Sequence, residues 1–233
     1  MGSLPMAKHT ALIIGASRGL GLALVRVYLQ RGWHVVATVR GEPPAALGDG
    51  HGGRLRVERV DITQETEIDA LRERLARERF DLVLANAAIA TEDRDANAAT
   101  VSDMEFIDVM VTNVLGPMRV LEAFESLVPA SGVLAAMSSG LGSVENNTQG
   151  GWNVYRASKA ALNQMLRSFA NERAGDRRAV LALDPGWVRT DMGGHAATLS
   201  VDESIPRLVD AIASYAGKAG AHFVTYRGGT LPW

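Results

Sequence analysis

Hydrophobic residues along the chain fall into short, nearly continuous runs, separated by longer stretches in which apolar residues recur with helical spacing. Runs rich in Val, Ile and Leu are typical of strands buried on both faces of a parallel sheet. They predict strands at 10–14, 34–39, 55–60, 81–85, 132–137, 180–183 and 222–226. The stretches between them predict helices at 20–31, 65–79, 102–127, 152–172 and 202–216.

This regular alternation predicts an α/β fold, with a doubly wound, mostly parallel sheet of seven strands and helices on both faces. No repeat or low-complexity linker divides the sequence, so residues 1–233 are expected to form a single domain. The Gly- and Pro-rich segment 41–54 is expected to be a surface loop. Residues 1–6 are interpreted as partly an expression remnant, with Met6 as the natural start.

Composition narrows the classes of partner. The chain has 24 basic and 26 acidic side chains, which argues against a nucleic acid or an anionic membrane held by bulk charge. It has no cysteine, which excludes a disulfide scaffold, a thiolate zinc site and a cysteine nucleophile. Its five histidines lack metal-ligand spacing, so we expect no metal. No apolar run reaches the roughly 18 residues of a membrane helix, and we expect a cytoplasmic protein.

The first predicted strand ends in a glycine-rich turn with the spacing GxxxGxG, directly before a predicted helix. Glycines allow a tight turn and close approach of the backbone to a diphosphate, and the helix N-terminus offers free N–H groups. The turn therefore predicts a dinucleotide site, although such turns also serve as ordinary connections. Its expected contact residues are Gly15, Ser17, Arg18, Gly19, Leu20 and Gly21.

Two arginines indicate which dinucleotide is bound. Arg40 ends the second predicted strand, where an acid would bind the ribose hydroxyls of NAD, and Arg18 lies inside the glycine turn. Two guanidiniums suit a 2′-phosphate, so the cofactor is expected to be NADP(H). The alternative is that both arginines are solvated surface residues.

Further motifs follow the glycine turn in a fixed order. They are Asp61-Ile62, Asn86-Ala87, Asn113, Ser138-Ser139, Tyr155 with Lys159, and Pro185-Gly186-Trp187-Val188-Arg189-Thr190. The whole series resembles the single-domain short-chain dehydrogenase/reductase family, with a Rossmann-type sheet. Within that family it is most similar to the C-factor and sniffer-type carbonyl reductases.

The resemblance implies a catalytic set of Asn113, Ser139, Tyr155 and Lys159. A phenol with an ordinary pKa near 10 exchanges protons poorly at pH 7, and Lys159, at i+4 on the same helix face, is expected to lower that pKa. Ser139 is expected to polarise the substrate carbonyl; Ser138 is the alternative but fits the family's Ser-x-x-Gly pattern less well. Asn113 is expected to bend its helix and anchor a water relay to Lys159, against the alternative of a helix end before Gly116.

The resemblance also implies further contacts with the cofactor. They come from Asp61, Ile62, Asn86, Ala87, Tyr155, Lys159, Pro185, Gly186, Val188 and Thr190. Thr190 has an alternative role as a cap of a short helix. Ala88 stands where the family has glycine, which tightens the space beside the adenosine. The loop around 145–151 is longer than is common in the family and resembles that of sniffer-like members.

The expected activity is hydride transfer between NADP(H) and a small-molecule carbonyl or alcohol, with Tyr155 as general acid/base. The alternative is an NAD(P)-binding signalling protein of the C-factor type with little or no turnover. Segment 191–206 is expected to form a short flap over the pocket. Trp152, Trp187, Met192 and Met104 are either pocket lining or core. We expect a homodimer or homotetramer that pairs through helices 102–127 and 152–172.

Overall fold

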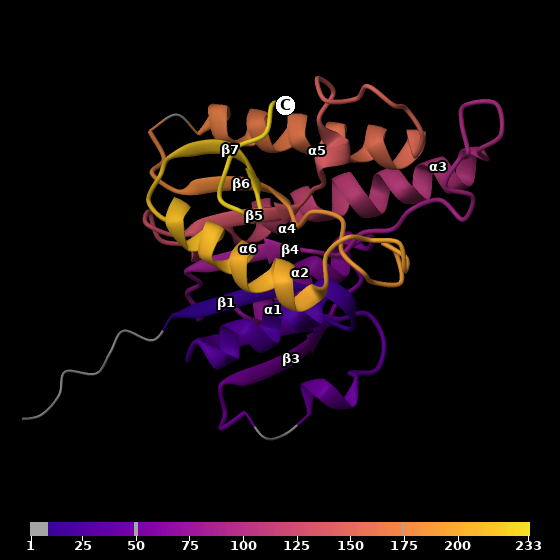
Figure 1. The fold of residues 1–233 in the computed structure, drawn as a ribbon. Coiled ribbons are helices and arrows are strands. Elements are labelled where there is room, and N and C mark those ends of the chain that lie inside the picture. The colour runs from indigo at the N-terminus through magenta and orange to yellow at the C-terminus, as the bar shows by residue number, and fades with distance from the viewer. Residues whose placement is uncertain (1–8, 49–50, 174) are drawn as a thin grey trace, which may run out of the picture.

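One seven-stranded sheet forms the centre of the molecule, in a computed structural model that describes residues 9–48, 51–173 and 175–233. All neighbouring strands run parallel, in the order β3-β2-β1-β4-β5-β6-β7 (Figure 1). The doubly wound fold is therefore confirmed. The strands are β1 (Thr10–Ile14), β2 (His34–Val39), β3 (Leu55–Arg59), β4 (Leu82–Ala85), β5 (Val133–Met137), β6 (Ala179–Asp184) and β7 (Gly220–Thr225).

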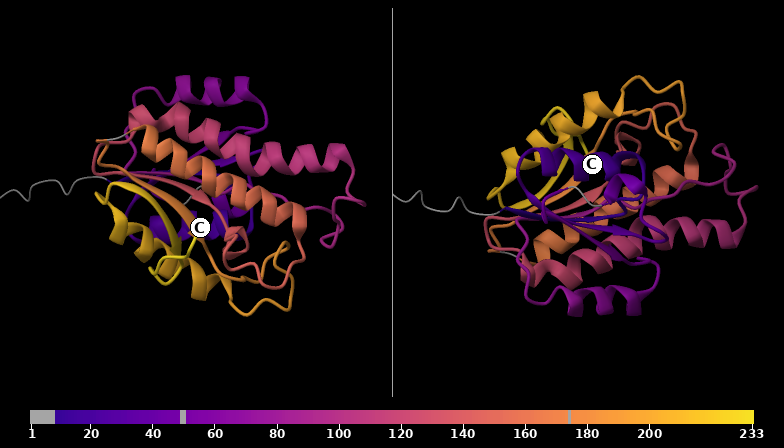
Figure 2. Two further views of the ribbon diagram at one scale, coloured as in Figure 1. Left: turned by 90° about the horizontal axis from the view of Figure 1, so that it is seen from above. Right: turned by 90° about the horizontal axis from the view of Figure 1, so that it is seen from below.

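Helices cover both faces of the sheet and create two separate hydrophobic cores (Figure 2). Helices α1 (Gly19–Gln30) and α6 (Val201–Tyr215) pack on one face, against β-strand residues such as Ile13 and Leu181. Helices α2 (Glu65–Arg74), α4 (Gly116–Phe124) and α5 (Asn153–Glu172) cover the other face. This two-sided burial is the reason the strands are apolar throughout rather than alternating. The remaining helical segments are α3 (Asp103–Met110), η1 (Ala45–Leu47), η2 (Val111–Leu115), η3 (Glu125–Leu127) and η4 (Gly140–Gly142).

Two predicted helices differ from the structure. Helix α2 ends at Arg74 rather than at residue 79, because Phe80 is fully buried and its N–H bonds to the Leu127 carbonyl, which draws the preceding residues out of the helix. The predicted helix 102–127 is interrupted at η2, which is a π-helix. π-Turns inside α-helices often mark functional sites.

Two predictions concern residues that lie outside the described ranges. They are the interpretation of residues 1–6, with Met6 as the natural start, and residues 49–50 of the predicted loop 41–54. The rest of that loop is irregular apart from η1, as predicted. No helix of the described residues is long and apolar enough to cross a membrane.

The strand order reverses between β1 and β4, since β2 and β3 lie on one side of β1 and β4 to β7 on the other. Ligands of open parallel sheets bind in the crevice outside the carboxyl ends of the strands at such a point. Ile14, Ala85 and Ala136 lie opposite one another in the ladder. The loops that follow these residues therefore meet at one edge of the sheet.

Candidate active site

The glycine turn connects β1 to α1 through close contacts with the loop after β4. Gly15 has φ +83°, and a side chain there would collide with Ala87, its nearest atom 2.8 Å away. Gly21 lies against the Gly15 carbonyl, and the Asn86 amide donates to the same oxygen at 2.9 Å. Ser17, Arg18 and Gly19 are exposed ahead of the first helical turn, whose N–H groups lack a side-chain cap. The turn thus leaves backbone donors free for an anion.

Both predicted phosphate-binding arginines lie at this edge of the sheet. Arg40 directly follows β2 and is exposed. Arg18 pairs with Asp191 of the flap at 2.5 Å, and both side chains are about three-quarters exposed, so this ion pair adds little stability. A ligand phosphate could therefore displace Asp191 from Arg18 at small cost.

The remaining cofactor residues divide between two loops. Asp61 accepts from the N–H and hydroxyl of Thr63 at 2.9 and 2.8 Å, while Ile62 is buried against Gly116. This side of the crevice is held rigid by local contacts.

The loop after β6 carries the other predicted residues. The Pro185 carbonyl accepts from the Ser204 hydroxyl at 2.6 Å, and Val188 is buried and bridges to Leu199. Thr190 accepts from the Gly193 N–H at 3.0 Å, so it does stabilise a turn. It also lies next to Gly19 of the glycine turn, which joins the flap to the cofactor crevice.

The two serines after β5 have separate surroundings. Ser138 is buried and donates to the Asn163 amide oxygen at 2.6 Å, so its hydroxyl is committed to the core. Ser139 caps η4 by accepting from the Leu141 N–H, and its hydroxyl hydrogen-bonds to Tyr155. This geometry favours Ser139 over Ser138 as the residue that meets a substrate.

Tyr155 and Lys159 share one face of α5, as their spacing predicts. The Lys159 ammonium is fully buried, lies 5.5 Å from the centroid of the Tyr155 ring, and donates to the Met137 carbonyl at 2.8 Å. Tyr155 is buried with its ring edge-on to Trp152. The serine, phenol and ammonium therefore converge at the carboxyl ends of β5 and β6.

The pKa of Tyr155 differs from the prediction. Burial raises it above the ordinary value, the nearby Asp184 carboxylate raises it further, and only the Ser139 hydrogen bond lowers it. Burial also lowers the pKa of Lys159 to about 7, so the lysine is only partly charged at neutral pH. Desolvation is thus the largest influence on the pKa values of both groups.

Asn113 is completely buried inside the π-helix η2. Its amide oxygen accepts from the Ile89 N–H, and its amide nitrogen donates to the Ile89 carbonyl and to the Ser158 hydroxyl, all at 2.8 to 3.0 Å. Ser158 in turn donates to the Tyr155 carbonyl. The helix continues into α4, so the alternative of a helix end before Gly116 is wrong. Asn113 joins η2, the loop after β4 and the catalytic helix.

Sequence reasoning missed two polar residues that build the site. One Asp184 oxygen accepts from the N–H groups of Gly140 and Gly186, at 2.9 and 3.1 Å, which ties the serine loop to the loop after β6. Burial raises the pKa of Asp184 against these two bonds. Asn163 donates to the Gly142 carbonyl and so supports η4. The position of Asp184 at a strand end was the available signal.

The mouth of the site is formed partly by aromatic residues. Trp187 is half exposed and donates to the Gly193 carbonyl at 2.9 Å, and Met104 is 76% exposed, so the core alternative is wrong for both. Trp152 and Met192 are partly buried. The base of the flap is closed by the Val188–Leu199 bridge.

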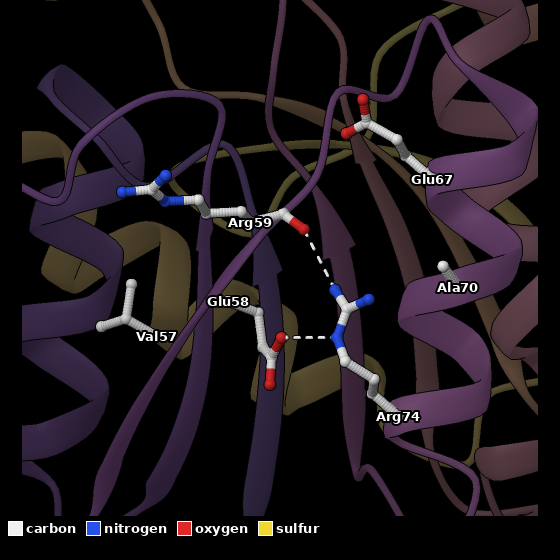
Figure 3. A pocket seen from close by; sticks show the side chains of 6 residues that line it. All are labelled: Val57, Glu58, Arg59, Glu67, Ala70 and Arg74. Carbon is white, nitrogen blue, oxygen red and sulfur yellow. Dashed lines mark hydrogen bonds and ion pairs between the residues drawn. The ribbon is translucent and has the colours of Figure 1, made fainter.

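A second concavity lies between β3 and α2 (Figure 3). Its charges pair with each other, since Arg74 donates to Glu58 at 2.8 Å and to the Arg59 carbonyl at 3.1 Å. Burial raises the pKa of Glu58, but hydrogen bonds from Arg74 and Arg56 outweigh it and lower that pKa. The side chains that line this groove include no hydroxyl, lysine or histidine. The described residues also contain no cluster of three or more His, Asp or Glu arranged around a metal position.

The sequence and the fold of this chain both match known proteins. The profile of the short chain dehydrogenases covers residues 9–198. The chain belongs to the short-chain dehydrogenase/reductase family. A putative short-chain dehydrogenase/reductase from Burkholderia multivorans, solved with bound NADP, is 46% identical with a TM-score of 0.94, covering 97% of this chain and 100% of that one.

Two further relatives of the short-chain dehydrogenase/reductase family are informative. A carbonyl reductase from Pseudomonas aeruginosa, solved with NADP, is 37% identical with a TM-score of 0.90, over 97% of this chain and 100% of that one. C-signal of Myxococcus xanthus is 37% identical over 139 residues, which are 56% of this chain and 82% of the relative. The resemblance predicted from the motifs is confirmed.

Proposed function

We propose that this protein is an NADP(H)-dependent carbonyl reductase that uses Tyr155 as its general acid/base. The observation that carries the proposal is the convergence of the Ser139 hydroxyl, the Tyr155 phenol and the Lys159 ammonium beside the crevice at the carboxyl ends of the strands. Its substrate is a small-molecule carbonyl, or an alcohol in the reverse direction. A cytoplasmic location stays a prediction of the sequence.

The cofactor fits residues that the structure brings together. The glycine turn packs against Asn86 and Ala87 without side chains in between, which leaves room for a diphosphate above the N-terminus of α1. Arg18 and Arg40 meet the 2′-phosphate, and Thr190 and Gly186 line the nicotinamide side. The two NADP-bound relatives support this assignment.

Each catalytic residue has one role in the reaction. NADPH, held by the glycine turn and the loop after β6, would supply the hydride for the carbonyl carbon. Ser139 donates a hydrogen bond to the carbonyl oxygen, and Tyr155 transfers its proton to that oxygen as negative charge develops. Lys159 stabilises the phenolate that remains. Asn113 acts through Ser158 and the α5 backbone to hold Tyr155 in place.

A signalling role without turnover is the second candidate, favoured by the likeness to C-signal. A protein that only senses the cofactor needs the glycine turn but not a proton donor. The Ser139 hydroxyl beside Tyr155 is not among the expected cofactor contacts, and cofactor sensing alone does not require it. The complete catalytic set therefore supports a reductase.

The test is oxidation of NADPH with a panel of aldehydes and ketones, followed by absorbance. The proposal expects turnover of at least one carbonyl above the rate without protein. Binding of NADPH with no turnover of any member of the panel would support the signalling alternative instead.

A further inference from the structure

Arg94 is part of the β4–α3 connection and contacts Asp191 of the flap. The connection and the flap lie at the same end of the sheet (Figure 1). Its guanidinium carbon is 4.8 Å from the centroid of a Trp152 ring, and it donates a long, 3.4 Å hydrogen bond to the Asp191 carbonyl. The Trp152 and Tyr155 rings meet edge-on, 5.6 Å apart. One aromatic ring therefore separates this cation from the proton donor.

The tryptophan between them is held in a strained conformation. Trp152 is the one residue other than glycine with a positive φ among the described residues, at +52°. Such a conformation is unfavourable for a bulky side chain and persists only where surrounding contacts impose it. Here the contacts to Tyr155 and Arg94 fix the indole. The Trp152 indole therefore has a fixed position between Arg94 and Tyr155.

Arg94 also keeps most of its donors available. It is partly buried, whereas its acidic neighbours Glu92, Asp93 and Asp95 are exposed, so its side chain turns inward and theirs turn to solvent. In the part of the chain that the structure describes, the Asp191 carboxylate pairs with Arg18, and Arg94 joins no ion pair. A guanidinium has five N–H donors, of which one is used here.

We propose that Arg94 binds a carboxylate of the substrate, so that the preferred substrates are oxo acids whose carbonyl reaches Tyr155 while their carboxylate reaches Arg94. A planar guanidinium binds a carboxylate through two parallel hydrogen bonds, and stacking on Trp152 orients that plane in advance. An aromatic ring between the two substrate groups would lie along the indole. This inference rests on the proposed reductase function and adds the substrate class.

Two aldehydes that share a benzaldehyde ring test whether Arg94 forms a carboxylate subsite. They are 4-carboxybenzaldehyde and its neutral methyl ester, each assayed with NADPH. In both cases the hydride reduces the aldehyde carbon, Tyr155 protonates the oxygen, and the products are an alcohol and NADP⁺. We expect kcat/KM to be about tenfold higher for the acid. Arg94→Gln should bring the ratio close to one, and Arg94→Lys should give an intermediate ratio. High salt should also reduce it.

Arg167 provides the matched control, because it also stacks on a tryptophan, Trp233, at 5.6 Å. It lies twelve residues beyond Tyr155 on α5, about 18 Å along the helix. Arg167→Gln should therefore keep the acid-to-ester ratio of the wild type. A fall of the ratio in Arg167→Gln equal to that in Arg94→Gln would contradict a local subsite.

The two proposals fail in different ways. Equal kcat/KM for the acid and the ester in the wild type would overturn the carboxylate subsite and leave the reductase intact. If neither aldehyde is reduced, calorimetric binding of 4-(hydroxymethyl)benzoate to the protein with NADP⁺ decides the subsite. Binding that weakens about tenfold in Arg94→Gln supports it, and equal binding in both proteins overturns it.

Discussion

Burial controls the protonation of the two groups at the centre of the site. Lys159 has one hydrogen-bond partner, the Met137 carbonyl, and no water-facing atom, so its charged form loses hydration without full compensation. Tyr155 is buried beside the Asp184 carboxylate, which disfavours the phenolate. Burial therefore keeps the Tyr155 phenol protonated, which is the form that the proposed reduction would use.

The lowered pKa of Lys159 predicts how stability depends on pH. The unfolded chain binds this proton up to its ordinary pKa of 10.5, and the folded chain only up to about 7. Between these values the unfolded state binds more protons, so the free energy of unfolding rises with pH, by at most about 1.4 kcal/mol per pH unit. Below pH 7 both states bind it and the cost of the buried charge is present in full.

Urea unfolding of the cofactor-free protein at pH 7 and pH 9 measures this effect. Lys159→Met should show a smaller increase between the two pH values than the wild type does. The same increase in both proteins would mean that Lys159 is not the group responsible.

At the scale of elements, the π-helix η2 is held by one buried amide. Asn113→Ala removes three hydrogen bonds and leaves the Ile89 N–H and carbonyl without their partner. We expect a loss of about 3 kcal/mol in the free energy of unfolding, measured by urea denaturation. Ser158→Ala removes only one of these bonds and should cost less. A loss no larger for Asn113→Ala than for Ser158→Ala would contradict this role.

Arg40, directly after β2, and Arg18, directly before α1, predict the choice between cofactors. NADPH should be preferred to NADH by at least about tenfold in kcat/KM, because both arginines would form charge-assisted hydrogen bonds with the 2′-phosphate. Arg40→Asp should reverse the order by repelling the phosphate and accepting from the ribose hydroxyls. The measurement uses one carbonyl substrate with both cofactors. Equal wild-type values would mean that both arginines are only surface charge.

The sequence predicts those features of the fold and site that depend on local patterns, and misses those that depend on contacts between distant segments. The seven strands follow from local apolar runs, and Tyr155 and Lys159 are assigned from the ordered series of family motifs, with helical spacing placing both on one face. The π-turn at Asn113 depends on Ile89, a contact across 24 residues. The raised pKa of Tyr155 depends on Asp184 and on burial, which no local pattern encodes. Tertiary packing therefore decides what the motifs leave open.

At the scale of the whole molecule, exposed apolar side chains on α3, η2 and α5 predict self-association. Phe106 and Ile107 of α3, Leu115 of η2 and Met165 of α5 are 37–54% exposed, on the helices expected to pair. A C2 dimer would bury these residues from both subunits. Sedimentation at micromolar concentration should therefore give twice the 24.9 kDa mass of one chain, or four times that mass for a tetramer.

Ile107→Glu places a charge on that face and should shift the protein toward the monomer. Val144→Glu is the matched control. Val144 is 72% exposed and lies between η4 and α5, outside the helices expected to pair, so this substitution should not change the sedimenting mass. A wild-type protein that sediments only as one chain would reject the dimer.

In the proposed reaction, Tyr155 supplies the proton during carbonyl reduction. The most direct measurement is the steady-state rate of NADPH oxidation with one accepted aldehyde, in the wild type and in Tyr155→Phe, alongside NADPH binding by fluorescence. Tyr155→Phe keeps the buried ring, so it should fold and bind NADPH normally. Its turnover should fall by about 100- to 10,000-fold. A rate within a factor of about three of the wild type would contradict the account.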